Sequence, residues 1–200
     1  VTLSKFVNMT EDKEVIVKFA RLSGTVITHH YIQGTTTKIT LKDGTEAQDV
    51  TQTGLVGDIF ATKPLEESET YYQYVSSSET TSGKYKEETQ EVIYYYTLRE
   101  YNYKVEYYYS NVKDDTATET AKSAYKTQIT QYTDKVKDGY KLEKTENLPL
   151  EITENEENNI IKIYYVKRND LQYTVNYLEK GTNKVIHEPK TEGNQTFEEV

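Results

Sequence analysis

Apolar and polar residues alternate with a period of two along much of the chain, most clearly between residues 91 and 109. Two alternating segments follow one another there, with apolar or aromatic residues at Val92, Tyr94, Tyr96, Tyr103, Val105 and Tyr107. β-Branched and aromatic residues at alternate positions are typical of a pleated, half-buried strand. The polar bridge between the segments, residues 97–102, contains neither Gly nor an Asn-Gly pair, so it does not suit a tight hairpin. We therefore predict two strands that belong to two different structural units.

The same junction recurs twice, which indicates an internal repeat. The outgoing strands begin at residues 15, 92 and 161, and the incoming strands begin at residues 27, 103 and 173. The spacings are 77 and 69 residues for the first set and 76 and 70 for the second. The matching alternate positions are Val15, Val17, Phe19, Ile27, His29 and Tyr31 in one copy, and Ile161, Ile163, Tyr165, Tyr173, Val175 and Tyr177 in the other. The outgoing and incoming strands recur with the same spacing, which is about the length of a small domain. This shared period favours tandem repeats.

This period divides the chain into two complete units, residues 23–98 and 99–168, with a fragment at each end. We interpret residues 1–22 as the C-terminal strand of a preceding repeat, with a free-standing terminal arm as the alternative. Residues 169–200 are interpreted as the truncated start of a third repeat. Strands dominate each unit, with room for at most a short helix, so the predicted fold class is mostly β (α+β). We expect Asp58, after a Gly-rich loop, to cap such a helical turn.

Composition excludes several classes of function. The net charge of −9 argues against nucleic acid as a partner, because such binding depends on clustered Lys and Arg. No apolar run approaches the ~20 residues of a membrane span, so we expect no membrane insertion of this segment. The absence of Cys excludes disulfides and thiol chemistry here. Hydrophobic residues make up only 35% of the chain, but 20 Tyr residues supply large buried areas with a polar end, which favours thin folded sheets over disorder.

Several motifs resemble the mucin-binding-protein (MucBP) repeats of Gram-positive cell-surface proteins and the related Tyr-rich repeats of gut Firmicutes. They are the opening strands His29-His30-Tyr31-Ile32 and 173–177, the central Gly54-Leu55-Val56-Gly57-Asp58 followed by 61–64, and the closing strand 91–96. The first unit matches best. The second and third units match in their strands but replace the central Gly-rich element with residues 121–125 and 193–197.

The resemblance implies a ubiquitin-like β-grasp fold, in which a mixed sheet wraps a short helix or coil, repeated as beads along a semi-rigid stalk. It also implies an extracellular, cell-wall-anchored surface protein whose anchor lies outside this segment. The implied partners are host mucin or other glycoproteins and neighbouring repeats of the same chain. Adhesion and a purely spacing role are both compatible with the family.

Candidate catalytic and metal-binding groups are few. His29 and His30 are adjacent, so on a strand they point to opposite faces; we expect His29 to face inward, as a core residue. No nucleophile motif accompanies them, and the paired carboxylates fall in turn-like, solvated positions. We therefore predict no enzyme activity, no catalytic residue, no metal and no cofactor. A weak calcium site at a repeat junction and an intramolecular Lys-Asn isopeptide bond remain open alternatives.

The Tyr clusters supply the only candidate ligand-binding residues. Alternation sends Tyr95, Tyr108 and Tyr164 to the face opposite the core. There they either cover the open side of the sheet and contact neighbouring units, which we favour, or form aromatic platforms for sugar rings. We rank a structural spacer first and a dedicated glycan-binding module second. An accessory part of a glycan-processing enzyme is a distant third.

Overall fold

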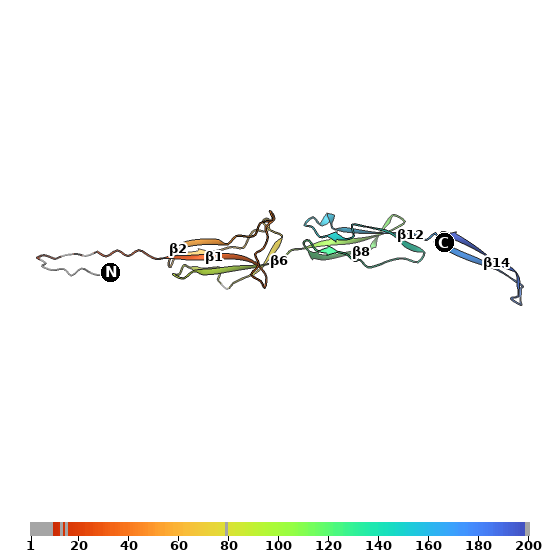
Figure 1. Ribbon diagram of the computed structural model, residues 1–200, viewed down its shortest axis with the longest axis horizontal. Helices are drawn as coiled ribbons and strands as arrows, with labels where there is room; N and C mark the ends of the chain where they lie inside the picture. Colours follow the sequence, from red (N-terminus) through yellow and green to blue (C-terminus); the bar gives the residue numbers. More distant parts are fainter. Residues whose placement is uncertain (1–9, 13, 15, 79, 199–200) are drawn as a thin grey trace. The chain divides into compact units, whose positions relative to one another are not determined.

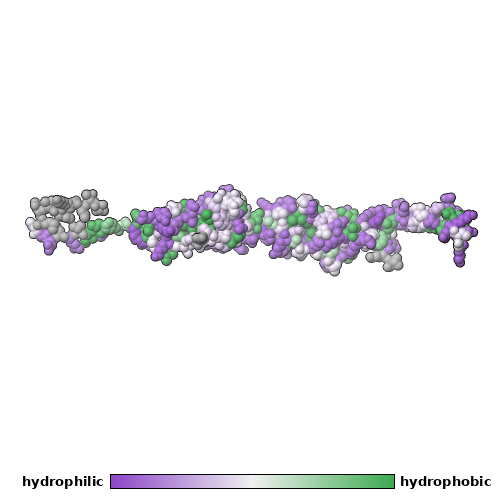
Figure 2. Space-filling model, turned by 90° about the horizontal axis from the view of Figure 1, so that it is seen from below, coloured by the Kyte–Doolittle hydropathy of each residue, from purple (hydrophilic) through white to green (hydrophobic). Residues whose placement is uncertain are grey.

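The computed structural model describes residues 10–12, 14, 16–78 and 80–198, and these residues form a mostly β protein. The chain divides into two compact units, Val1–Thr97 and Leu98–Val200 (Figure 1). In the view of Figure 2, polar side chains cover most of the surface of both units, with apolar residues scattered among them.

The first unit contains one four-stranded mixed sheet and one small sheet. Its strands are β1 (Ser23–Ile32), β2 (Val50–Leu55), β3 (Ile59–Ala61), β4 (Tyr72–Ser77), β5 (Ser82–Lys84) and β6 (Gln90–Leu98). The strand order in the main sheet is β2-β1-β6-β4, with β1 antiparallel to β2 and parallel to β6. Strands β3 and β5 pair antiparallel as a separate two-stranded sheet.

Residues 98–168 of the second unit repeat this arrangement, and the strands after them are described below as an end fragment. The elements of this repeat are β7 (Glu100–Tyr109), β8 (Val112–Ala124), β9 (Gln128–Ile129), β10 (Tyr140–Glu146), β11 (Leu150–Glu151), the 3-10 helix η1 (Glu156–Asn158) and β12 (Ile160–Lys167). The main sheet has the order β10-β12-β7-β8, with β7 antiparallel to β8 and parallel to β12. In both units the first strand therefore pairs in parallel with the last strand at the centre of the sheet, and the second strand lies outside the first.

The predicted core face of the two closing strands is confirmed. Val92, Tyr94 and Tyr96 of β6 are buried, as are their counterparts Ile161, Ile163 and Tyr165 of β12. The predicted inward residues Val105 and Tyr107 of β7 are buried too.

The predicted face of β1 is wrong by one residue. Val26, Thr28 and His30 face the core, whereas Ile27, His29 and Tyr31 lie on the opposite face and are only half-buried. Strand β1 contains apolar residues at both odd and even positions, so its own pattern does not show which face is buried. The parallel pairing resolves it, because Thr28 lies beside Val92 and His30 beside Tyr94, and side-by-side residues share a face.

The predicted helical turn at Asp58 is also wrong, and part of the Gly-rich loop before it is strand. The backbone N–H of Gly57 donates to the carbonyl of Tyr85, and the N–H of Tyr85 donates to the carbonyl of Asp58, both at 2.9 Å. These bonds extend the sheet pairing of β3 and β5. Gly57 has φ +90°, which explains a glycine at this turn. Among the described residues, η1 is the only helical segment.

The two end fragments differ from the complete units. The predicted strand at residues 15–19 begins outside the described residues, and residues 16–22 contain no strand. Strands β13 (Leu171–Leu178) and β14 (Val185–Gln195) form an antiparallel pair. Tyr173, Val175 and Tyr177 remain 52%, 38% and 38% exposed, because no further layer covers this pair among the described residues.

Candidate functional site

The core-face tyrosines of the second unit bind a covering segment that has no regular structure. This segment, residues 130–137, is called the second strap. The Tyr107 hydroxyl donates to the carbonyl oxygen of Thr133 at 2.7 Å, and the Tyr109 hydroxyl donates to that of Lys135 at 2.5 Å. The strap is not helical, so its backbone groups need partners from elsewhere. The tyrosine hydroxyls supply these partners. Phe at the same positions would fill the space but would offer no polar group.

Tyr165 of β12 completes this layer. Its hydroxyl donates to Asp134 Oδ1 at 2.5 Å and accepts from the backbone N–H of Lys135 at 3.1 Å. Burial raises the pKa of Tyr165 far above its usual value, and the hydrogen bond to Asp134 acts in the same direction. The hydroxyl therefore stays protonated and acts as a structural donor.

The first unit uses the same device on its own covering segment, residues 62–69, which is called the first strap. The Tyr96 hydroxyl accepts from the backbone N–H of Leu65 at 3.0 Å, and the Tyr94 hydroxyl lies 2.8 Å from Thr62 Oγ1. Burial raises the pKa of Tyr96 to about 12. The abundance of Tyr in this chain thus has a structural cause in both units.

The opposite, open face of the second sheet brings two of the predicted site residues together. Tyr108 and Tyr164 are direct neighbours on the parallel strands β7 and β12. Their rings stack with centroids 4.8 Å apart and an interplanar angle of 19°. Both side chains are half-buried.

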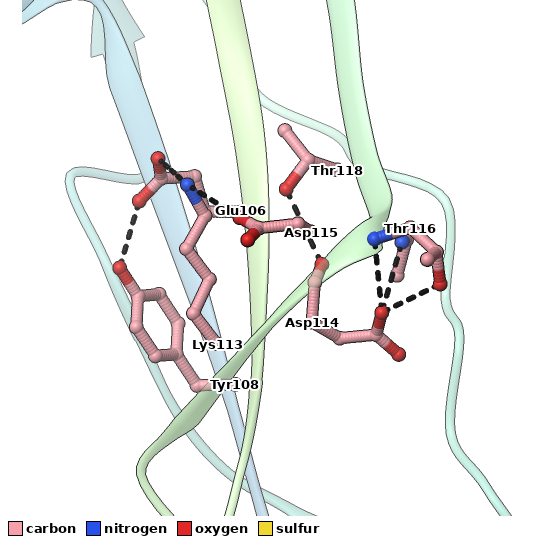
Figure 3. A network of polar contacts seen from close by, with 8 residues as sticks. Glu106, Tyr108, Lys113, Asp114, Asp115, Thr116 and Thr118 are labelled. Carbon is pink, nitrogen blue, oxygen red and sulfur yellow. Dashed lines mark hydrogen bonds and ion pairs between the residues drawn. The ribbon is translucent and has the colours of Figure 1, made fainter.

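A buried carboxylate fixes the Tyr108 end of this stack (Figure 3). Glu106 is only 8% exposed, and its two oxygens accept from Lys113 Nζ and from the Tyr108 hydroxyl, each at 2.8 Å. Burial opposes ionisation of Glu106, but these hydrogen bonds outweigh it, so its pKa lies below the usual value. Burial and the neighbouring carboxylate raise the pKa of Tyr108 to about 12.

A second carboxylate and lysine occupy the Tyr164 end. The Tyr164 hydroxyl donates to Glu146 Oε2 at 3.1 Å, and Lys144 Nζ lies 2.6 Å from Glu146 Oε1. Lys144 Nζ also lies 4.6 Å from the centroid of the Tyr164 ring. Since β12 lies between β7 and β10, Lys144 covers the ring face that Tyr108 does not. Both faces of Tyr164 are therefore occupied, and mainly its edge remains for another molecule.

Strand β8 contains a bulge, and hydrogen bonds to Asp114, the residue of β8 just before it, stabilise its conformation. Pairing with β7 shifts between Val105 and Tyr107, so several residues of β8 bulge out. Asp114 Oδ1 accepts from the Thr116 N–H at 3.0 Å and from its hydroxyl at 2.7 Å, as Figure 3 shows. Lys137 of the second strap reaches Asp114 Oδ2 at 2.9 Å. Hydrogen bonds from Thr116 and Lys137 hold the pKa of Asp114 well below its usual range.

The third predicted site residue, Tyr95, lies in the first unit beside Tyr31 of β1. It is half-buried and lines a shallow depression with Ser76 and residues 33–37. Tyr31 and Tyr95 occupy the sheet positions that Tyr108 and Tyr164 occupy in the second unit.

Sequence reasoning missed the polar partners of these tyrosines and the role of one histidine. Glu106 alternates with Tyr108 on one strand, a signal that could have placed both on the open face. His29 Nδ1 lies 3.0 Å from Asp49 Oδ1 on that face, and the buried His30 contacts Tyr96. In the part of the chain that the structure describes, no cluster of three or more His, Cys, Asp or Glu residues has the arrangement of a metal site.

The chain matches no family model, and no curated protein shows significant similarity to it. Among the described residues, no helix combines the length and the apolar character needed to cross a membrane.

Proposed function

We propose that the chain is a non-catalytic stalk region of a bacterial cell-surface adhesin, built from tandem β-grasp repeats. The support is the strand order shared by the two units, in which the parallel first and last strands lie at the centre of a mixed sheet. Sequence motifs that resemble MucBP repeats point in the same direction. Extracellular, wall-anchored placement belongs to the same proposal.

The parallel pairing of first and last strands is the observation that carries this proposal. In a parallel pair, the start of β7 and the end of β12 lie at opposite ends of the ladder. Tension applied at those two points acts along the strands, so the evenly spaced ladder hydrogen bonds share the load and must break together. The first unit has the same geometry in β1 and β6. Each unit is therefore suited to transmit force between a cell wall and an attached surface.

The short connection between the sheets is compatible with a stalk. Strand β6 ends at Leu98 and β7 begins at Glu100, so only Arg99 separates them. A flexible Gly/Ser linker is absent at this point, which leaves little slack in the chain.

The tyrosines of the open face are structural in this account. A sugar ring stacks on a free aromatic face, whereas both faces of Tyr164 are already covered and its hydroxyl is hydrogen-bonded. We therefore place the aromatic-platform hypothesis second to the stalk.

Retention on immobilised mucin distinguishes a purely structural role of the open-face tyrosines from the aromatic-platform hypothesis. The whole chain and a Tyr95→Ala/Tyr164→Ala variant, both shown by circular dichroism to be folded, would be compared at matched concentrations. We expect equal retention of the two proteins. Saturable binding that the variant loses would make the open face an adhesive site and contradict the structural role of these tyrosines.

A further inference from the structure

A cavity of about 280 Å³ lies between the sheet of the first unit and the first strap. This volume is slightly below the range of small-molecule pockets, which span roughly 300–1,000 Å³. Polar groups from two strands and the strap line it together with apolar ones. The residues that matter here are Thr28, His30, Gln52, Leu65, Glu66 and Glu69.

Two residue differences between the units account for this cavity. By pairing register, Thr28 corresponds to Val105, and His30 corresponds to Tyr107. Tyr107 is fully buried and its hydroxyl reaches the second strap. His30 is shorter and stops at the Tyr96 hydroxyl, 2.8 Å from its Nδ1, so space remains beneath the first strap.

The wall of the cavity contains a polar group with no partner. Thr28 is 3% exposed, and its Oγ1 has no hydrogen-bond partner among the described residues. An unpaired buried hydroxyl is unfavourable, and native proteins rarely retain one without a reason. His30 is buried as well, and burial lowers its pKa, which favours the neutral imidazole. With Nδ1 engaged by Tyr96, Nε2 is the remaining polar atom of that ring.

The first strap contributes acceptors and an apolar surface. Glu66 and Glu69 lie on the lining, and Glu69 Oε2 accepts from the Glu66 backbone N–H at 2.9 Å, which orients that carboxylate. Lys63 Nζ lies 3.1 Å from Glu66 Oε1, so each carboxylate has a second oxygen outside these contacts. Pro64 and Leu65 line the same space. Acceptors beside an apolar surface suit a molecule that has hydroxyl groups on its rim and C–H groups on its faces.

We propose that this cavity binds one neutral pyranose ring, such as the terminal sugar of a glycan. Carboxylates and an amide accept from sugar hydroxyls, Thr28 gains its missing partner, and Pro64 and Leu65 pack on the C–H face. Lys63, which also lines the cavity, pairs with Glu66, so Glu69 is the carboxylate that disfavours acidic sugars. The volume suits one ring better than a chain. The proposal deepens the surface role above and relies on it only for the source of the glycan.

The test is a titration of the whole ¹⁵N-labelled chain with the methyl glycosides of galactose, N-acetylgalactosamine and fucose, and with sialic acid. We expect saturable amide shifts with at least one neutral sugar, confined to β1, β2 and the first strap, and no saturable shifts with sialic acid. A single ring with a few hydrogen bonds should bind with a Kd on the order of 1 mM.

Matched variants identify the site. Glu69→Gln and Gln52→Ala should each weaken binding about tenfold, as expected for loss of one good hydrogen bond. Glu91→Gln removes the same charge from an exposed position of β6 outside the cavity and should bind as the parent does. Absence of saturable shifts with all three neutral sugars would overturn the proposal, as would parental affinity in both cavity variants. Mechanical strength of the units is independent of either result, so failure here leaves the stalk proposal intact.

Discussion

The tyrosine hydroxyls are the central feature at the residue scale. Core-face tyrosines reach from the sheet to a strap that lacks regular structure, and their hydroxyls bind its backbone. Open-face tyrosines stack and bind carboxylates instead. A chain poor in aliphatic residues thus forms two thin cores, because one residue type supplies both the buried area and the polar partners.

Removal of one core-face hydroxyl should therefore destabilise the second unit. Tyr165→Phe leaves Asp134 and the Lys135 N–H without their buried partner. We expect the free energy of unfolding to fall by about 1–3 kcal/mol. Tyr164→Phe is the matched control on the same strand; its hydroxyl lies on the open face, so its loss should cost less than about 1 kcal/mol. Urea denaturation of both variants measures the difference, and equal losses would contradict the distinct roles of the two faces.

The sequence predicts the face of some tyrosines and not their contacts. In β12 the polar Lys162 shares a face with Tyr164, opposite Ile161 and Ile163, and this pattern indicates an outward Tyr164 even though Ile160 and Val166 lie on the same face. Its stacking on Tyr108 does not, because the two residues meet only through parallel pairing of strands that are far apart in the chain. Likewise, nothing local indicates that Glu106 is buried between a lysine and a tyrosine hydroxyl.

At the scale of elements, the closing strands were predictable and the covering segments were not. Strand β6 has one clear apolar face, whereas β1 is apolar at both parities, and only its pairing with β6 selects the buried one. The sequence leaves room for at most a short helix in each unit, and a helix would pair its own backbone groups. The tyrosine hydroxyls of β6 and β12 supply several of these partners, and the straps remain irregular.

Close packing explains one glycine of the Gly-rich element in the first unit. A Cβ on Gly54 of β2 would lie 2.3 Å from the ring of Tyr85. Gly54→Ala should therefore overpack this site and lower the free energy of unfolding of the first unit by about 1–3 kcal/mol. Gly193→Ala is the control, since a Cβ there meets no atom within 4 Å. Thermal unfolding of both variants would test this, and an unchanged Tm for Gly54→Ala would count against close packing at Gly54.

At the scale of the whole molecule, two units of unlike sequence share one sheet topology. They differ where the first unit has Thr28 and His30 and the second has Val105 and Tyr107. The shared strand order supports the proposed stalk role of both units, and the different interior residues support the sugar site proposed for the first unit alone.

The direction in which a unit resists force is the most direct test of this account. The chain contains no Cys, so pairs of introduced cysteines can define where a single molecule is pulled. Attachment through Arg99→Cys and Arg168→Cys loads β7 and β12 along their length, whereas attachment through Arg99→Cys and the exposed Asn158→Cys pulls the two strands apart from one end. We predict a clearly higher unfolding force for the first pair, because the ladder bonds then break together. Equal forces for the two geometries would contradict a load-bearing role for the parallel strands.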